Sequence, residues 1–477
     1  MRHAELPLVV LVLAIALVLR VAALSADAPG WLSWSAGIYS DEGIYSNDAR
    51  MIVLDRQRVP GDFQISVVAP MQYHLLVRVF RRFGASLRSV RLTAVAFGMA
   101  TLVAFWLTLR LTYDRSTSLA GLVLLSVSAP FVLYNRLGLL EMPALFWLTA
   151  AYLALAAAQQ SDRLLLRLPN LVLAGALAGI SVAWKGTFLL GAIPLLASAI
   201  WRHRTESIAV VCGAAATLGV FAVQFFLPNR AEMARVGKYY LERQYLPHSL
   251  AGVCHDLLRG LMTGAADGVL PYVFRLAPAL LLFALCALLP SVRGKSDIWL
   301  WLWIGVPILA FLFSNYTPSR YFLIFWPALA ALAARSIVKL PRTLMVRALA
   351  LCACVVFDFC LLGSAYAQRT YTLPADSRTL AAALPDGAWV AGQFAPAMCL
   401  DNKVRAIYVQ PGLANNAGAA LSQLPTTHVL ATRVESSADD PWAEQYQNLI
   451  AGPGGLKSLP VGRRFIVDLY ANKEALP

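Results

Sequence analysis

Two adjacent carboxylates, Asp41 and Glu42, follow the first apolar segment of the chain. That segment is long enough to cross a bilayer, so both acids are expected where a membrane helix meets water. An ionisable side chain beside lipid is costly to keep, which makes it a candidate for a functional site. A carboxylate there can take a proton from a hydroxyl group or bind a divalent cation.

A second candidate acid, Glu141, lies five residues after Arg136. Pro143 suits the first turn of a helix, which puts Glu141 at the helix N-terminus, where the dipole favours a carboxylate. The simplest alternative is that Glu141 only caps this helix. The same stretch also offers a guanidinium, so the two side chains are candidates for one polar site.

Two basic residues are placed to bind an anion. Arg320 precedes a late apolar span, and a guanidinium presents a planar fork that matches phosphate oxygens. The alternative is an arginine that extends to lipid headgroups. Lys185 lies at the junction of two short apolar spans, where it either assists such a site or anchors the topology.

The composition is that of a polytopic membrane protein. Of 477 residues, 59% are hydrophobic and only 14% are charged. The net charge of +14 would suggest nucleic acid in a soluble protein, but the basic residues gather in short loops, as membrane insertion requires. The seven cysteines show no metal-ligand spacing, and one disulfide between Cys254 and Cys399 is left open.

Eleven apolar runs approach the roughly 20 residues that a bilayer requires. Residues 8–24 are expected to be an uncleaved first helix with its start in the cytoplasm. The other ten runs are 92–111, 117–133, 142–158, 171–184, 187–201, 208–227, 272–289, 298–313, 321–334 and 348–365. Asp358 lies inside the last run and is expected to reach a neighbouring helix or water.

The basic residues test this count, because cytoplasmic loops carry an excess of Lys and Arg. All short loops that the count places in the cytoplasm contain such residues: Arg110, Arg115, Arg163, Arg167, Arg202, Arg204, Arg293, Lys295, Arg335, Lys339, Arg342 and Arg347. If residues 171–201 were one helix, every later loop would change sides and the bias would fail. An odd number of spans places the C-terminus outside the cytoplasm.

The sequence changes character after residue 367. Apolar runs shorten to strand length at 389–391, 406–409, 428–431 and 464–470, and a helix is expected at 375–384. We therefore expect an all-α polytopic membrane domain over residues 1–367, with an outer loop at 25–91. Residues 368–477 are expected to form a small extracytoplasmic α/β domain. Its sequence contains no recognisable catalytic, phosphate-binding or zinc-binding motif.

The first outer loop resembles that of a known family. It contains the acid pair Asp41 and Glu42, then Tyr45, a proline-aromatic step at residues 70–74 and a closing arginine, Arg91. This ordered set resembles polyprenyl-phosphate-sugar glycosyltransferases of the GT-C class, which include protein O-mannosyltransferases and lipid A aminoarabinose transferases. The resemblance extends over about residues 1–335. Residues 67–70 lack the Glu-Lys pair of the aminoarabinose enzymes, which argues against that donor.

The resemblance implies an activity and a location. The enzyme would be a hexosyl- or pentosyltransferase that inverts the anomeric centre. It would lie in the bacterial cytoplasmic membrane, in contact with membrane lipids. It would move a sugar from a polyprenyl monophosphate donor to a glycolipid, glycan or protein acceptor at the periplasmic face, with its C-terminal domain on the same side. A transporter or lipid flippase is the main alternative, but it should carry its ionisable groups near the bilayer midplane. A structural subunit that binds a partner is the other alternative, and no nucleic acid partner is expected.

The resemblance also implies roles for single residues. Asp41 would be the catalytic base, while Glu42 and Glu141 would hold a divalent cation or shape the acceptor pocket, and the need for a metal is left open. The donor phosphate would be bound by Arg320, Lys185 and Arg136, and the substrate pocket would include Tyr45, His74 and Tyr321. Residues 229–267 are expected to be an outer loop that covers the site.

Overall fold

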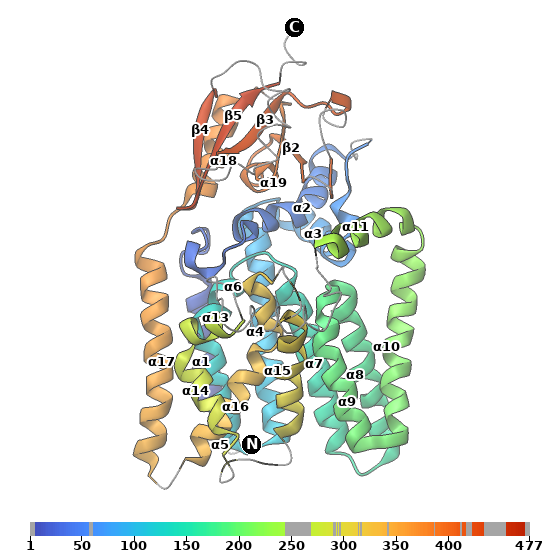
Figure 1. The fold of residues 1–477 in the computed structure, drawn as a ribbon, viewed down its shortest axis with the longest axis vertical. Coiled ribbons are helices and arrows are strands. Elements are labelled where there is room, and N and C mark those ends of the chain that lie inside the picture. Colours follow the sequence, from blue (N-terminus) through green and yellow to red (C-terminus); the bar gives the residue numbers. More distant parts are fainter. Residues whose placement is uncertain are drawn as a thin grey trace, which may run out of the picture.

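The computed structural model describes residues 5–56, 61–243, 269–289, 292, 294, 297–312, 314, 317–340, 343–385, 387–410, 413–415, 422–433 and 455–472. Long helices run side by side in its lower part, and a five-stranded sheet lies beyond their upper ends (Figure 1). Two further helices lie between the helical bundle and the sheet, α2 (Gly37–Asp55) and α3 (Pro70–Phe83). The expected loop at residues 25–91 is therefore largely helical.

The bundle combines long helices with short ones. Its helices are α1 (Glu5–Val21), α4 (Leu87–Thr112), α5 (Arg115–Val127), α6 (Ala129–Asn135), α7 (Glu141–Gln159), α8 (Leu164–Trp184), α9 (Leu189–His203), α10 (Ile208–Phe221), α13 (Val269–Leu276), α14 (Pro278–Cys286), α15 (Ile298–Leu312), α16 (Trp326–Lys339) and α17 (Leu344–Ala367). Within the described residues, five helices are long and apolar enough to cross a membrane, or six if one bent pair is a single span. The count of eleven spans stays a prediction.

One expected span is broken and others are shorter than a membrane span requires, so fewer helices than expected qualify among the described residues. The run 117–133 is divided into α5 and α6, which meet at an angle of 60°. At this break, the backbone N–H of Ala129 donates to Asp358 of α17 at 2.7 Å, and Trp326 donates to the Ser128 hydroxyl at 2.8 Å. Backbone groups at apolar depth must be satisfied within the protein. Asp358 thus reaches a neighbouring helix, as expected, and stabilises its broken end.

The C-terminal sheet has the strand order β2-β1-β3-β5-β4. Its strands are β1 (Trp389–Gly392), β2 (Arg405–Tyr408), β3 (His428–Arg433), β4 (Lys457–Val461) and β5 (Phe465–Ala471), with helices α18 (Thr372–Ala383) and α19 (Ala395–Met398). β1 runs parallel to β2 and β3, whereas β5 is antiparallel to β3 and β4. The sequence analysis missed β4, because Pro460 argues against a strand. β4 tolerates this proline because it lies at the edge of the sheet.

Helix α2 joins the sheet domain to the bundle. Asn47 and Arg50 donate to backbone carbonyls of the sheet domain at 3.0 Å and 2.6 Å. A Cβ atom at Gly43 would lie 2.2 Å from the backbone nitrogen of Ala397, so only glycine permits this approach to α19. These residues recur at helical spacing and form one face of α2. That face fixes the position of the sheet relative to the helix.

A buried ion pair holds α2 on its other side. The carboxylate of Glu42 pairs with the guanidinium of Arg91 in α4, and both side chains are only 1% exposed. Glu42 also accepts the backbone N–H of Gly138 at 2.8 Å, while Arg91 donates to the carbonyl oxygens of Leu24 and Ala26 at 2.7 Å and 2.6 Å. These bonds tie α2 to α4, to the segment after α1 and to the segment after α6.

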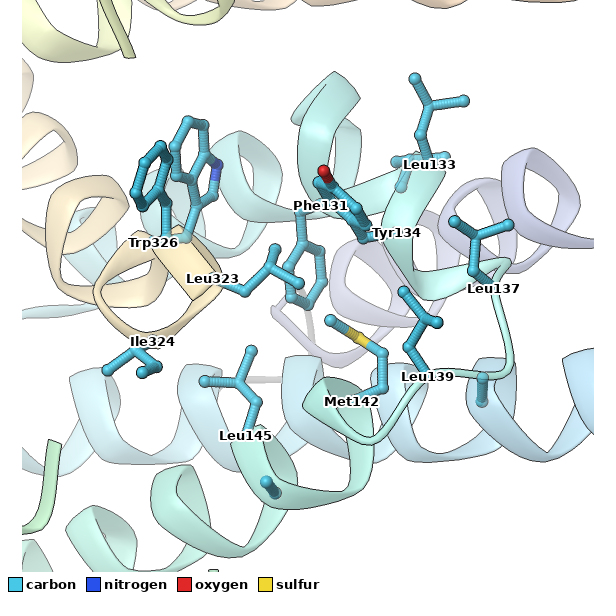
Figure 2. Packing of buried hydrophobic residues seen from close by; sticks show 14 of the residues in the cluster. Phe131, Leu133, Tyr134, Leu137, Leu139, Met142, Leu145, Leu323, Ile324 and Trp326 are labelled. Atoms are coloured by element: carbon cyan, nitrogen blue, oxygen red, sulfur yellow. The ribbon is translucent and has the colours of Figure 1, made fainter. Parts of the chain in front are cut away.

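An apolar core lies between α6, α7 and the 3-10 helix η7 (Ser319–Ile324). Figure 2 shows Leu323 of η7 pointing toward Phe131 of α6, near Met142 of α7. These three side chains are at most 2% exposed. Arg320 of η7 and Glu141 of α7 are close in sequence to residues of this core. The packing of the core therefore sets how these two side chains face each other.

Removing the Glu42 carboxylate should destabilise the protein strongly. Glu42→Ala leaves the Arg91 guanidinium buried without its counter-charge, and we expect a loss of about 3–5 kcal/mol in the free energy of unfolding. Glu206→Ala is the matched control, because its 2.6 Å pair with Arg167 is 25% exposed, and such pairs contribute about 0–1 kcal/mol. Thermal unfolding of the purified protein in detergent compares the two. Equal losses would contradict the structural role of Glu42.

Candidate active site

Arg320 connects two carboxylates that come from different helices. Its Nη2 lies 2.8 Å from Oδ2 of Asp41 in α2, and its Nε lies 3.1 Å from Oε1 of Glu141 in α7. The ammonium group of Lys185 also pairs with Glu141. The structure thus brings four predicted site residues into one network, in which two carboxylates balance two positively charged side chains.

Each member of the network has a position that its local structure explains. Glu141 begins α7, and Lys185 ends α8 as its C-cap residue. Arg320 lies in η7, which starts directly after Pro318. A Cβ atom at Gly37 would lie 2.3 Å from Nη1 of Arg320, so this glycine provides the space in which the guanidinium reaches α2.

A pocket of about 360 Å³ opens beside this network, and Asp41 and Arg320 form part of its lining. This volume lies within the range of roughly 300–1,000 Å³ that is typical of small-molecule sites. The remaining lining residues are Trp34, Ser35, Ala36, Gly37, Ser40, Ile44, Tyr45, Ile65, Val68, Tyr239, Tyr321, Gln393, Tyr408, Gln410, Leu413, Arg464 and Phe465. The bundle, α2, α11 (Arg230–Arg243) and the C-terminal domain all contribute.

Asp41 has the properties of a base. Burial raises the pKa of its carboxyl group above the usual range, while Arg320 opposes this shift and the like charge of Glu141 adds to it. Its side chain is 13% exposed and borders the pocket. A carboxylate with a raised pKa holds a proton more strongly, which favours proton transfer from a hydroxyl group near neutral pH.

The ring of Tyr321 contacts both basic groups of the network. The Tyr321 ring centroid lies 4.5 Å from Nζ of Lys185 and 5.6 Å from Cζ of Arg320. Cation–π contacts of this kind hold a positive charge in place without neutralising it. Tyr45 and Tyr321 both line the pocket, where the sequence analysis expected them.

Five predicted site residues do not line the pocket: Glu141 and Lys185 adjoin it only through Arg320, and Glu42, Arg136 and His74 lie outside both the pocket lining and the Arg320 network. Glu42 is buried against Arg91, although it is adjacent to Asp41 in the sequence. Arg136 donates to the backbone carbonyl of Ala23 and lies over another aromatic ring at 5.0 Å. His74 packs against the rings of Tyr73 and Phe225. The structure gives these three residues contacts of packing and pairing instead.

The predicted acids do not form a cation site by themselves. Glu42 is neutralised by Arg91, and Glu141 is contacted by both Lys185 and Arg320. A divalent cation requires several oxygen ligands with surplus negative charge. Over the residues that the structure describes, no three His, Cys, Asp or Glu side chains are arranged to hold a metal ion.

The sequence analysis missed the contribution of the C-terminal domain. Gln393, Tyr408, Gln410 and Arg464 line the pocket, although no motif marks them. The available signal was that strand-length runs end just before Gln393 and Gln410, but their place beside Asp41 depends on how the sheet docks. Tyr239 of α11 belongs to the expected covering loop, whose residues 244–268, with Cys254, lie outside the described residues.

Residues 67–230 match a family model described as dolichyl-phosphate-mannose-protein mannosyltransferase. The structure of ArnT from Cupriavidus metallidurans in the apo state is similar, with a TM-score of 0.62 and 15% identity over 99% of this chain and 100% of that chain. ArnT bound to undecaprenyl phosphate gives 0.62 and 14% over the same shares. The oligosaccharyltransferase of Archaeoglobus fulgidus in the apo form gives 0.58 and 12% over 90% of this chain and 70% of that chain.

These matches extend over nearly the whole chain at low identity, so they show a common fold. They include the C-terminal region, because the ArnT match covers 99% of this chain. The chain therefore shares its fold with ArnT and with the oligosaccharyltransferase, and its residues 67–230 match the model of the dolichyl-phosphate-mannose-protein mannosyltransferase family.

Proposed function

We propose that this protein is an integral membrane glycosyltransferase that moves a sugar from a polyprenyl monophosphate to an acceptor hydroxyl group. The observation that carries the proposal is the position of Arg320 between Asp41 and Glu141 at the edge of a pocket. The match of residues 67–230 to the mannosyltransferase family model and the fold shared with ArnT, which was solved with undecaprenyl phosphate, support it. Neither comparison supports a transporter or flippase.

Donor binding would change the partners of Arg320. In the structure, Arg320 is 2.8 Å from Asp41. The donor phosphate carries a negative charge that competes for the same guanidinium, and a planar fork binds two phosphate oxygens at once. When Arg320 turns to the phosphate, the Asp41 carboxylate loses its counter-charge and becomes a stronger base.

The transfer itself would be a single displacement. The acceptor oxygen forms a bond to the anomeric carbon while the bond from that carbon to the phosphate oxygen breaks, and its electron pair leaves with the polyprenyl phosphate. Asp41 takes the acceptor proton. The leaving phosphate gains one negative charge, which Arg320 and Lys185 stabilise. Attack from the side opposite the phosphate inverts the anomeric centre.

Glu141 would act through its neighbours. It contacts both Arg320 and Lys185, so its carboxylate holds the two basic groups on the same side of the pocket. A fixed pair of cations requires little rearrangement as charge develops on the phosphate. In this assignment Glu141 is a positioning residue and Asp41 is the base.

The proposal also includes the sugar, the acceptor, the domain roles and the orientation in the membrane. The transferred group is a hexose or pentose, and the acceptor is a glycolipid, glycan or protein. Residues 1–367 form the catalytic membrane domain and residues 368–477 a small extracytoplasmic domain, although both line the pocket. The pocket opens at the outer face of a bacterial cytoplasmic membrane, because the basic loops lie at the opposite end of the helices.

Removing the base should stop transfer. We expect Asp41→Asn to lower the transfer rate about 10²–10⁴-fold, because asparagine keeps the shape of the side chain and loses its basicity. Asp55→Asn is the matched control, since Asp55 lies on the same helix in a 2.8 Å pair with Arg405. Purified protein with synthetic polyprenyl-phosphate sugars and a membrane extract as acceptor provides the assay. Near-normal turnover of Asp41→Asn would exclude Asp41 from the mechanism.

The pH dependence should report the charges around Asp41. Its carboxylate must be deprotonated, and its pKa is raised, so we expect kcat/KM to fall on the acid side at a pH above the usual carboxyl value of about 4. Glu141→Gln removes a like charge and should move this fall to lower pH. Arg320→Ala removes an opposing charge and should move it to higher pH. An unchanged acid limb in both variants would contradict the assignment.

The guanidinium of Arg320 should matter beyond its charge. We expect Arg320→Ala to weaken binding of polyprenyl phosphate, and Arg320→Lys to restore only part of it, because an ammonium group cannot bind two oxygens in a plane. Arg405→Lys is the control, since Arg405 pairs with Asp55 away from the pocket lining. Binding is measured by the quenching of tryptophan fluorescence. Full recovery of polyprenyl phosphate binding in Arg320→Lys would refute the proposal that the guanidinium binds two phosphate oxygens.

The orientation can be tested with reporter fusions. α17 ends at Ala367, and basic residues flank its start: Arg335, Lys339, Arg342 and Arg347. A reporter that is active only in the periplasm should be active when fused after Tyr371 and inactive when fused after Lys339. The reverse result would place the C-terminal domain in the cytoplasm.

A further inference from the structure

One wall of the pocket comes from the carboxyl ends of two parallel strands. β1 and β2 pair in register up to Gly392 and Tyr408, so both strands end at the same level. Gln393 follows β1 directly, and Gln410 lies two residues beyond β2. Both side chains line the pocket that contains Asp41. The carboxyl edge of parallel strands is a common place for ligand binding.

Gln410 is held in a fixed orientation. Its Nε2 donates to the hydroxyl of Tyr239 at 3.1 Å, and the hydroxyl of Tyr408 donates to its Oε1 at 3.2 Å. Its backbone exchanges two hydrogen bonds with Ala414, at 2.9 Å and 2.8 Å. The residue is only 9% exposed. A polar side chain fixed in this way is prepared to bind a ligand at little cost in entropy.

The Gln410 amide has capacity for further hydrogen bonds. A primary amide offers two N–H donors and two acceptor lone pairs. Among the described residues, the contacts with Tyr239 and Tyr408 use one of each. The remaining donor and acceptor match a hydroxyl group, which both donates and accepts.

The chemistry of this wall differs from that of the Asp41 side. Gln393, Gln410, Tyr408 and Tyr239 are neutral hydrogen-bonding groups, and none of them balances a phosphate or a metal ion. The lining cation from the sheet domain, Arg464, already donates to the carbonyl oxygen of Ser33 at 2.6 Å. Neutral amides and aromatic rings suit a ligand with many hydroxyl groups and an apolar face.

We propose that Gln410 and Gln393 bind hydroxyl groups of a sugar ring in this pocket and thereby select the sugar that the protein accepts. This inference rests on the proposed glycosyltransferase function. A site built to hydrogen-bond a hydroxyl group discriminates strongly against a ligand that lacks it. The ring has two possible sources, the transferred sugar of the donor and a sugar of the acceptor, and both present the same chemistry.

The experiment measures binding without turnover, on the full-length Asp41→Asn protein. The first probes are synthetic polyprenyl phosphate and its mannosyl, glucosyl and arabinosyl derivatives. We expect at least one derivative to bind more tightly than the bare lipid. Gln410→Leu should lower that affinity about tenfold, or about 1.4 kcal/mol, and leave the affinity for bare lipid unchanged. Gln393→Ala should act in the same direction, and it provides the test if Gln410→Leu does not fold.

The second arm identifies the source of the ring. Methyl glycosides of the same sugars are added to protein saturated with bare polyprenyl phosphate, and their binding is measured by saturation-transfer NMR. A loss in Gln410→Leu in this arm alone assigns the ring to the acceptor, and a loss in the first arm assigns it to the donor. The exposed Gln368, changed to Leu, is the matched control and should alter neither arm.

Two results would overturn the inference in distinguishable ways. If both glutamine variants bind every sugar probe like the parent protein, the sheet wall does not contact a sugar, while the proposed function stands. If bare polyprenyl phosphate does not bind the parent protein, or binds it independently of Arg320, the proposed function fails and the inference fails with it.

Discussion

A charge buried beside a membrane must be paired, and in this protein the pair of Glu42 and Arg91 meets that requirement. The pair fixes the angle at which α2 lies across the upper ends of the bundle (Figure 1). Asp41 is the preceding residue, so its carboxylate points about 100° away around the helix axis. One anchored helix thus directs one acid into the protein and the other toward the pocket and Arg320.

The site shows how opposite charges keep basic groups available near lipid. Arg320 and Lys185 would be costly in an apolar setting, but Asp41 and Glu141 compensate them. The compensation is not permanent, because a substrate that carries its own negative charge offers an equivalent partner. The same ion pairs that permit folding can therefore be exchanged during binding, provided that the packing of η7 against α6 and α7 holds the backbone still.

The sequence predicted the class of protein and named Asp41, Glu141, Lys185 and Arg320 as candidate site residues, which the structure connects through ion pairs. These predictions rest on local signals: hydrophobic length, a proline in a first helical turn, and ionisable residues next to apolar runs. The separate fates of Asp41 and Glu42 could not be predicted, because both are acids in the same loop and only tertiary packing distinguishes them. The sheet wall with Gln410 was missed for a similar reason, since its place depends on docking against Asn47 and Arg50.

The contact between Gly43 and Ala397 has a consequence for how such proteins diversify. The two backbones approach too closely for any larger residue, so the sheet domain and α2 must change together. A chimera that exchanges only residues after 367 would pack a foreign sheet domain against an unmatched α2. The mismatch would lie at Gly43, two residues from Asp41. The natural unit of exchange is therefore discontinuous in sequence: the sheet domain together with α2. Recombination at the apparent boundary would disturb this contact, whereas recombination of both parts would keep it.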